Sequence, residues 1–167
     1  CHETYKTESG DWVEPADVLQ GHGDNFVHAE TRETVTVGRS EKMSKSKKNV
    51  IDPEDIISTY GADTARWFML SDSPPERDLD WTESGITGAW RFSNRLWRLA
   101  AANAATLPPP GSDPGTSDAR RAVHAAIAGV TEDLEAFHFN RSVARVHELV
   151  NALSDIDPAT DGGALRE

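Results

Sequence analysis

Arg39-Ser-Glu-Lys-Met-Ser-Lys-Ser-Lys-Lys48 is a basic segment within an acidic chain. It contains five basic residues and one acid, including four of the five lysines in the sequence. The whole chain of 167 residues has 17 Lys+Arg against 28 Asp+Glu, a formal net charge of −11, so the segment carries +4 and the remainder −15. That acidity disfavours indiscriminate binding to nucleic acid or to an anionic membrane. We therefore interpret the lysine segment as the place where the chain uses its positive charge.

The centre of this segment, Lys42-Met43-Ser44-Lys45-Ser46, lacks helical or strand periodicity and is expected to be a loop. Its chemistry suits a polyphosphate. Lysine ammonium groups supply mobile point charges, while serine hydroxyls and free backbone N–H groups donate hydrogen bonds to phosphate oxygens. Charge alone leaves two alternatives open, a solvated basic loop and a contact to nucleic acid.

Two β-hairpins are predicted on the N-terminal side of the loop. Residues 2–6 and Trp12-Val13 flank the turn signal Glu8-Ser9-Gly10-Asp11, and Phe26-Val27-His28 precedes the β-branched run Thr34-Val35-Thr36-Val37. We therefore expect a small β-rich unit over residues 1–38. The chain opens at Cys1 with no initiating Met and no signal segment, which we interpret as an internal piece of a longer protein.

Two short helices are predicted after the loop. Asp52 is an N-cap residue, Pro53 suits the first helical position, and Gly61 ends the first helix. The second helix spans residues 63–70 and ends before Ser73-Pro74-Pro75. It is apolar nearly all round, so we expect it to be buried. The loop and these helices form a connector over residues 39–80.

Three long amphipathic helices are predicted in the remainder of the chain. The first spans residues 83–107, the second spans residues 118–137 after a Pro- and Gly-rich linker, and Asn140 is expected to cap the third. The apolar stripes of the last two helices contain Val123, Ile127, Val130, Leu134 and Phe137, then Val143, Val146, Val150 and Leu153. Short connections predict an antiparallel bundle over residues 81–167, which we expect to continue past the chain end. The fold class is α+β.

The pentapeptide Lys42-Met43-Ser44-Lys45-Ser46 resembles the signature loop of class I aminoacyl-tRNA synthetases. A specified pentapeptide occurs by chance in roughly one chain in ten thousand of this size. The flanking sequence resembles the subgroup that activates leucine, isoleucine and valine, and most of all the bacterial leucyl-tRNA synthetases. The stretches that carry this likeness are Lys47-Lys48-Asn49-Val50-Ile51-Asp52-Pro53, Tyr60-Gly61-Ala62-Asp63-Thr64-Ala65-Arg66, Pro74-Pro75-Glu76-Arg77-Asp78-Leu79-Asp80-Trp81, Arg91-Phe92-Ser93-Asn94-Arg95-Leu96-Trp97-Arg98-Leu99 and Phe137-His138-Phe139-Asn140-Arg141.

The resemblance implies a cytoplasmic enzyme that activates leucine with ATP, accompanied by Mg²⁺, and transfers the leucyl group to tRNA(Leu). Within the loop, Lys45 would contact the ATP phosphates and stabilise the transition state as pyrophosphate leaves. Lys42 would be an accessory cation, Ser44 and Ser46 would hold the loop, and Met43 would pack it against the catalytic domain. The loop would close over ATP as a lid does.

The resemblance also assigns the three parts of the chain. Residues 1–38 resemble part of a leucine-specific insertion, residues 39–80 belong to the catalytic region, and residues 81–167 resemble a tRNA-binding helical domain of the anticodon-binding type. The family's other ATP signature, a His-Ile-Gly-His-type tetrapeptide, is absent, as are a leucine pocket and an editing domain. We therefore expect these residues alone not to aminoacylate. A stand-alone helical RNA-binding or adaptor module without catalysis is the alternative.

Other patterns in the sequence favour structural roles or remain open. The spacing of Cys1, His2, His22 and His28 matches no compact zinc site, so we interpret them as dispersed residues and expect no metal in this segment. Trp67, Trp90 and Trp97 recur at helical spacing, which favours core packing over base stacking. Arg91, Arg95 and Arg98 share one helix face, either as a tRNA backbone contact or as a solvated face with acid partners. Arg66 lies three residues after Asp63 and is expected to pair with it.

Overall fold

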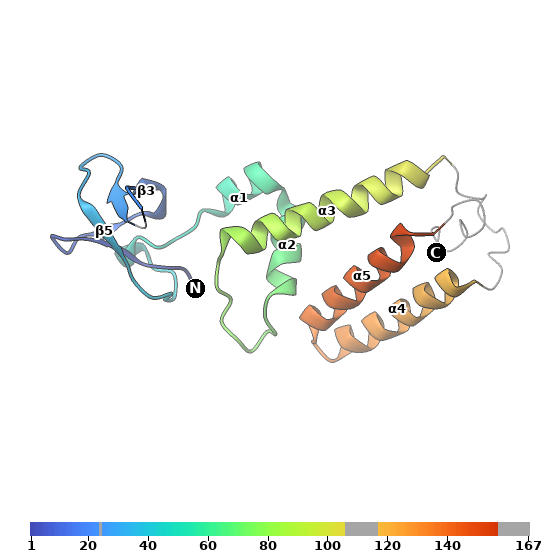
Figure 1. Cartoon of the computed structure of the whole chain (residues 1–167). Coiled ribbons are helices and arrows are strands. Elements are labelled where there is room, and N and C mark those ends of the chain that lie inside the picture. The colour runs from blue at the N-terminus through green and yellow to red at the C-terminus, as the bar shows by residue number, and fades with distance from the viewer. Residues whose placement is uncertain (24, 106–116, 157–167) are drawn as a thin grey trace. The chain divides into compact units, whose positions relative to one another are not determined.

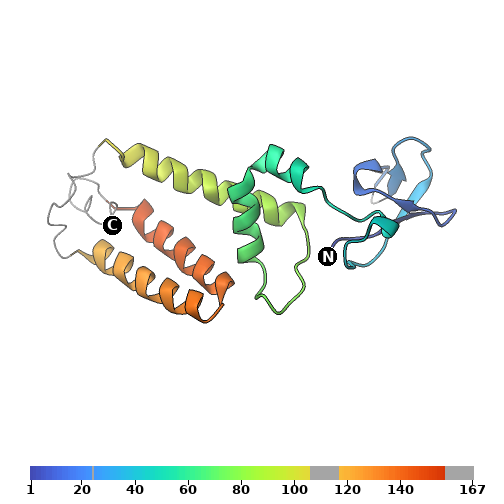
Figure 2. The same ribbon diagram turned by 180° about the vertical axis from the view of Figure 1, so that it is seen from behind.

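The computed structural model describes residues 1–23, 25–105 and 117–156. The chain forms two compact units, one built from Cys1–Gly61 and Asp78–Glu83, the other from Ala62–Arg77 and Ser84–Glu167. Strands occupy the first unit and long helices the second (Figures 1 and 2), which confirms the α+β class. Among the described residues, no helix is both long enough and apolar enough to cross a membrane.

A five-stranded antiparallel sheet forms the first unit. Its strands follow the order β2-β1-β5-β4-β3, so the last strand of the chain segment, β5, lies at its centre and pairs with the first, β1. The bounds are β1 Tyr5–Thr7, β2 Trp12–Val13, β3 Val18–Gln20, β4 Phe26–His28 and β5 Thr34–Val37. Both predicted hairpins, β1–β2 and β4–β5, are confirmed. The additional strand β3, paired with β4, was not predicted.

The β1–β2 hairpin is closed by a tight turn. Thr7 and Asp11 form a backbone hydrogen bond of 3.0 Å, and Gly10 has a φ of 95°, in the region that favours glycine. Val13 of β2 and Val35 of β5 are the buried apolar residues of these strands. At the end of β5, a Cβ on Gly38 would lie 2.5 Å from the Thr4 hydroxyl oxygen, so only glycine allows this close approach.

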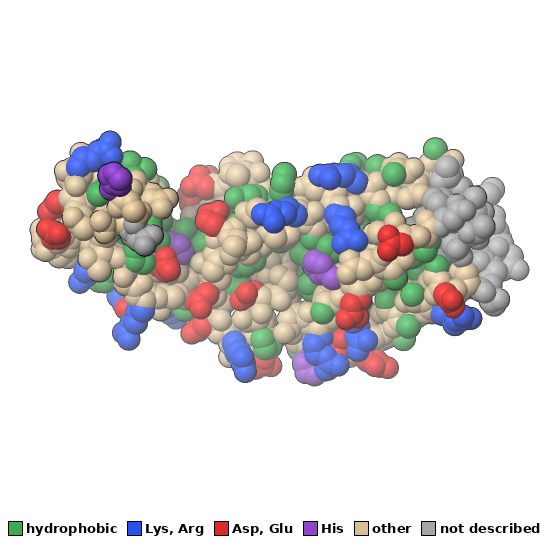
Figure 3. Space-filling model, in the orientation of Figure 1, with side chains coloured by type: hydrophobic (Ala, Val, Ile, Leu, Met, Phe, Trp, Pro, Cys, Tyr) green, Lys and Arg blue, Asp and Glu red, His purple; other side chains and the backbone are tan. Residues whose placement is uncertain are grey.

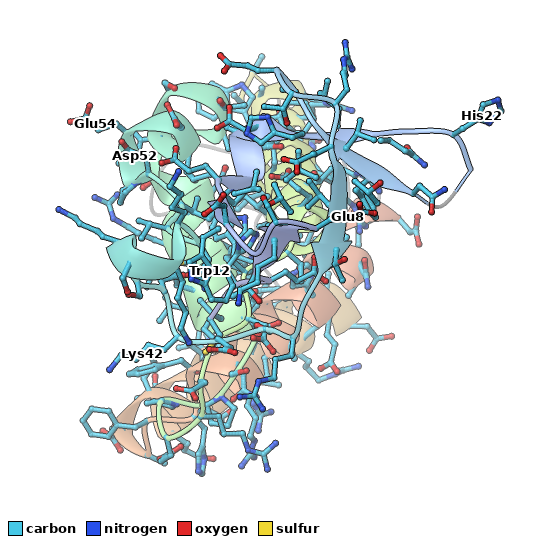
Figure 4. The ribbon with its side chains drawn as sticks, turned by 90° about the vertical axis from the view of Figure 1, so that its left-hand side faces the viewer. Glu8, Trp12, His22, Lys42, Asp52 and Glu54 are labelled. Carbon is cyan, nitrogen blue, oxygen red and sulfur yellow. The ribbon has the colours of Figure 1, made fainter. Side chains whose placement is uncertain are left out.

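Helix α1 (Pro53–Tyr60) begins as its sequence predicts. The Asp52 carboxylate accepts a hydrogen bond of 2.9 Å from the backbone N–H of Glu54, and Pro53 occupies the first turn. Figure 4 labels Asp52 and Glu54 at this helix start. The helix ends at Gly61, which has a φ of 87° and donates to the carbonyl of Ile57. Cap, proline and glycine together confirm the predicted bounds.

Four helices form the second unit. They are α2 (Ala62–Ser71), α3 (Glu83–Asn103, within this unit from Ser84), α4 (Asp118–Glu135) and α5 (Phe139–Ser154). Helices α4 and α5 lie side by side and antiparallel, joined by a short turn (Figures 1 and 2), and α2 packs against α5. The predicted bundle is confirmed for these elements. The expected linker and the last two residues of the predicted first long helix, residues 106–116, lie outside the described part of the chain.

Aromatic stacking forms the core between α2, α3 and α5. The rings of Trp67 and Phe92 stack with centroids 5.0 Å apart, and the His147 ring lies 3.8 Å from Phe92. Phe68 and Ile86 are fully buried beside them. A second cluster joins Ala119 and Val123 to partly buried apolar residues of α5 and its C-terminal end, namely Leu149, Leu153 and Ile156. These contacts confirm the inward face that the α5 sequence predicts.

The expected complete burial of α2 is wrong. Met69 is 61 % exposed and Leu70 is also exposed, because α2 has one packing face, occupied by Thr64 and Phe68, toward the rest of its unit. The predicted core position is also wrong for two tryptophans of α3, which lie outside its packed face. Trp97 is 74 % exposed and Trp90 is exposed as well, whereas Trp67 stacks as expected.

The predicted apolar stripe of α4 is only partly correct. Val123 is buried, but Ile127, Leu134 and Phe137 are exposed. The helix instead turns Gly129 and Asp133 toward α5, because the Asp133 carboxylate binds two arginines of that helix. The face of α4 that packs on α5 therefore includes an ion pair, which the apolar periodicity does not register.

The predicted capping role of Asn140 is wrong. Helix α5 starts at Phe139, so Asn140 lies inside its first turn and His138 occupies the N-cap position. Helix α4 ends at Glu135, and Phe137 adopts a φ of 58° in the connecting turn. Because the chain already turns at the left-handed Phe137, the N-cap falls on His138, two positions before Asn140.

Candidate functional site

The lysine segment forms an extended strand-like entry followed by one tight turn. Ser44 is extended, with φ −151° and ψ 134°, and residues Lys45–Lys47 form a single 3₁₀ turn. The turn is closed by a hydrogen bond of 3.1 Å from the Lys47 N–H to the Ser44 carbonyl. Lys48 ends it in the left-handed conformation, with a φ of 53°. The predicted absence of a long helix or strand is confirmed.

A buried amide fixes the start of this turn. Asn49 is fully buried, and its side-chain oxygen accepts a hydrogen bond of 2.8 Å from the backbone N–H of Ser44. Its side-chain nitrogen donates to the carbonyls of His2 and Glu41 at 3.2 and 3.3 Å. The hydroxyl oxygens of Ser44 and Ser46 lie 2.8 Å apart, within hydrogen-bond distance. Sequence reasoning missed Asn49, although a polar residue directly before the apolar pair Val50-Ile51 was the available signal.

The lysines of the segment do not share one role. Lys47 forms an ion pair with the Glu41 carboxylate, whose other oxygen accepts from Arg39 at 3.1 Å. These two bonds, first Lys47 and then Arg39, lower the pKa of Glu41 below its ordinary value. The backbone of Glu41 is in turn paired with His2 through two hydrogen bonds of 2.9 Å. Lys47 is therefore committed to the scaffold of the loop.

Lys42 and Lys45 present free charge. Both side chains are exposed, and within the described residues neither enters an ion pair with a carboxylate. Figure 4 shows Lys42 at the periphery of the molecule in that view. Met43 is half-buried between them. Two ammonium groups on a loop with a fixed backbone can receive an anionic ligand without first breaking a salt bridge.

Concave surfaces adjoin both sides of the turn. Lys45 and Lys48 line a pocket of about 510 Å³ together with Asp52 and Pro53 at the start of α1. Ser46 and Lys48 line a second pocket, of about 490 Å³, beside the β1–β2 hairpin that carries Trp12 (labelled in Figure 4). The turn thus offers cationic and hydroxyl groups to cavities of the size that holds a small ligand.

Comparison with known proteins decides the family. The family described as tRNA synthetases class I (I, L, M and V) matches residues 26–82, which include the whole lysine segment. The chain is 60 % identical to the leucine–tRNA ligase of Paramagnetospirillum magneticum over 175 aligned residues, covering all of this chain and 20 % of that protein. This chain belongs to the leucine–tRNA ligase family. The leucine–tRNA ligase of Parvibaculum lavamentivorans is 52 % identical over 98 % of the chain and 20 % of its own length.

A solved structure supports the same assignment to the leucine–tRNA ligase family. The LeuRS in a ternary LeuRS–tRNA–LeuAMS complex from Agrobacterium radiobacter K84 matches with a TM-score of 0.63 and 29 % identity, over 75 % of this chain and 18 % of that chain. The chain spans about a fifth of the length of the curated leucine–tRNA ligases it matches. The predicted family resemblance is confirmed, and the alternative of a stand-alone adaptor module has no support.

The histidines of this ligase segment do not converge. Across the parts of the chain that the structure describes, no group of three or more His, Cys, Asp or Glu residues is placed to hold a metal ion. The ring nitrogen of His28 accepts backbone hydrogen bonds from Glu30 and Thr31, which closes the β4–β5 turn. His2 is buried, and that burial lowers the pKa of its imidazole.

The arginine face of α3 divides into two kinds of residue. Arg95 donates hydrogen bonds to Asn151 and Ser154 of α5, at 2.6 and 2.9 Å. Arg91 and Arg98 are exposed. On the face seen in Figure 3, basic and acidic side chains are interspersed over the helices rather than gathered into one basic patch. The expected pair of Arg66 with Asp63 is confirmed at 2.7 Å.

Proposed function

We propose that this chain is the part of a leucine–tRNA ligase that neutralises ATP phosphates during leucine activation and begins the tRNA-binding helical domain. The observation that carries the proposal is the pair of exposed ammonium groups of Lys42 and Lys45, which form no ion pair with a carboxylate of the described residues, on a loop whose backbone is held by buried Asn49. The names of the 50–60 % identical relatives supply the reaction class.

In the proposed reaction, the leucine carboxylate attacks the α-phosphorus of ATP, and the bond to the bridging oxygen of pyrophosphate breaks. Leucyl-adenylate forms, and negative charge accumulates on the departing phosphates. A cation fixed in position before this step stabilises the charged transition state more than the ground state. We assign this role to Lys45, with Lys42 as the accessory cation. The leucyl group then passes to the 3′ end of tRNA(Leu), and AMP is released.

The rest of the loop supports that role. Ser44 and Ser46 offer hydroxyls at the turn, and we assign Met43 to packing against the catalytic domain of the longer protein. Mg²⁺ is expected to accompany ATP and to neutralise phosphate charge. The charge that we assign to this segment itself comes from Lys42 and Lys45.

The helical unit is proposed as the start of the tRNA-binding domain. Residues 81–167 are assigned to that domain, residues 39–80 to the catalytic connector and residues 1–38 to the leucine-specific insertion. Arg91 and Arg98 are the candidates for contact with the tRNA backbone, since guanidinium groups suit phosphate. The cytoplasm is the expected location, because tRNA charging supplies translation there.

The experiment that tests the proposal uses a chimera, defined as the Paramagnetospirillum magneticum leucine–tRNA ligase in which residues 1–167 replace the matching stretch. We expect leucine-dependent exchange of labelled pyrophosphate into ATP at a rate close to that of the unmodified relative. Isoleucine and valine should support little exchange. A folded chimera with no leucine-dependent exchange would contradict the proposal.

A further inference from the structure

We infer that Asn49 is a positioning residue for leucine activation, because its buried amide holds the backbone of the turn that presents Lys45. This inference rests on the proposed function. Asn49 is fully buried, so we expect it to act through the loop rather than on ATP. Its three hydrogen bonds use both amide protons and the amide oxygen.

The first of these bonds closes the loop on itself. Ser44 and Asn49 are five residues apart, and the Asn49 oxygen binds the Ser44 N–H directly before the turn begins. The Ser44 carbonyl is already occupied by the Lys47 N–H. Both polar groups of the Ser44 backbone are therefore satisfied within the loop. The direction in which Lys45 leaves the backbone is fixed by this closed ring of residues.

The other two bonds attach that ring to the sheet-bearing unit. The Asn49 nitrogen donates to the carbonyls of His2 and Glu41, which are also paired with each other through their backbones. The amide thus joins three chain segments at one buried point. Loss of the side chain would leave the partly buried Ser44 N–H without this acceptor, which is costly, whereas the two carbonyls would keep their backbone partners.

A second restraint acts on the opposite side of the turn but does not replace Asn49. Lys47 is held to Glu41 by an ion pair between partly exposed side chains, and such a pair contributes little in water. It restrains the end of the turn, whereas Asn49 holds the backbone N–H of Ser44 at its start. Misplacement of a catalytic group by about 1 Å can cost about a hundredfold in rate. Asn49 is thus expected to affect the chemical step through the placement of Lys45.

The test compares Asn49→Ala with the matched control Asn25→Ala in the chimera. Asn25 is an exposed turn residue of the same unit. Rates are expressed per active site, determined from the burst of leucyl-adenylate, so that misfolded protein is not counted. We expect Asn49→Ala to lower kcat for exchange by about ten- to a hundredfold with the KM for leucine unchanged, and Asn25→Ala to behave as wild type.

A second variant covers the case in which Asn49→Ala does not fold. In Asn49→Asp, the protonated carboxyl offers one acceptor to Ser44 and one donor to a carbonyl, whereas the carboxylate offers no donor. The kcat per site of Asn49→Asp, relative to wild type, should rise as the pH falls, while Asn25→Asp shows no such trend.

The outcomes separate the inference from the proposed function. No exchange by the wild-type chimera contradicts the proposed function itself. An active wild type whose Asn49 variants lose active sites but keep the full kcat per site shows a role in folding only, and overturns the inference. A rise in the KM for leucine of the Asn49 variants as large as their fall in kcat also overturns the inference, since an effect on leucine binding would not act through Lys45.

Discussion

The Nε atom of Arg145 on α5 lies 2.6 Å from the carboxylate of Asp133 on α4 and donates a hydrogen bond to it. Arg141 approaches the other carboxylate oxygen at 3.2 Å. Asp133 is almost fully buried, and the hydrogen bond from Arg145 is the main cause that lowers the pKa of its carboxyl. The helical hairpin is thus held by an ion pair as well as by apolar contacts.

Gly129 provides the space for this ion pair. A Cβ at position 129 would lie 2.6 Å from a terminal guanidinium nitrogen of Arg145. We expect Gly129→Ala to displace Arg145 and Asp133→Asn to unpair it, and each to lower the unfolding temperature of the chain. Circular dichroism melts check this. The unfolding temperature of the double variant should fall by less than the sum of the two single decreases, because both substitutions disrupt the same contact between Arg145 and Asp133. Fully additive losses would contradict the coupling.

The stability of the helical unit is expected to depend on pH through His147. Burial, and then the nearby charge of Arg95, lowers the pKa of this imidazole below its ordinary value of 6.5. The unfolded chain therefore binds a proton more readily than the folded one, so stability is complete above about pH 6.5 and falls as the pH drops below it.

Urea titrations followed by tryptophan fluorescence measure the free energy of unfolding. They are carried out between about pH 5 and 8, a range that brackets the ordinary pKa of histidine. His147→Gln removes this titrating group and should reduce the loss of stability on the acid side. The buried His2 of the other unit, whose pKa burial also lowers, accounts for part of that loss. Control titrations of His22→Gln, at an exposed histidine in the other unit, should retain it. A wild-type stability that does not change between about pH 5 and 7 would contradict the lowered pKa of His147.

The arginine face of α3 should contribute unequally to tRNA binding. Arg91→Glu with Arg98→Glu is expected to weaken tRNA(Leu) binding by the chimera and to reduce the salt dependence of the affinity, because exposed guanidinium groups that meet phosphates release counterions. Arg66→Glu, at an exposed arginine paired with Asp63, is the control. Unchanged affinity and salt slope in the double variant would make the face structural.

Residues 1–167 alone are expected to form no leucyl-adenylate. In our proposal the segment supplies cations for the phosphates, but it has no residues matching the family's His-Ile-Gly-His-type signature. A pyrophosphate-exchange assay on the isolated chain at high protein concentration should stay at the level of a buffer control. Turnover above that level would show that the segment carries more of the active site than we assign to it.

Local signals predicted most of the secondary structure. Asp52, Pro53 and Gly61 bound α1 as capping and backbone rules require, and β-branched residues marked β5. Periodicity failed where packing is one-sided or ionic. Met69, Trp97 and Leu134 continue apolar patterns, yet their side chains are exposed in the described structure. The packed face of α4 includes the ion pair between Asp133 and Arg145, which a pattern of apolar residues does not reveal.

The candidate site was predictable in composition but not in construction. The pentapeptide located Lys42 and Lys45. That Lys47, unlike these two, forms an ion pair depends on where the Glu41 carboxylate lies in the fold. Asn49 acts through contacts with His2, which is 47 residues away in the sequence. Such long-range hydrogen bonds follow from the tertiary fold and have no local sequence pattern.

Lys45→Ala tests the central claim most directly. The matched control is Lys6→Ala, the one lysine outside the basic segment, which lies over the Trp12 ring at 4.1 Å. Both are compared in the chimera by leucine-dependent pyrophosphate exchange. We expect Lys45→Ala to lower kcat by about a hundredfold or more, as loss of a preorganised electrostatic group does, and Lys6→Ala to retain nearly full activity. Full exchange by a folded Lys45→Ala enzyme would contradict the account.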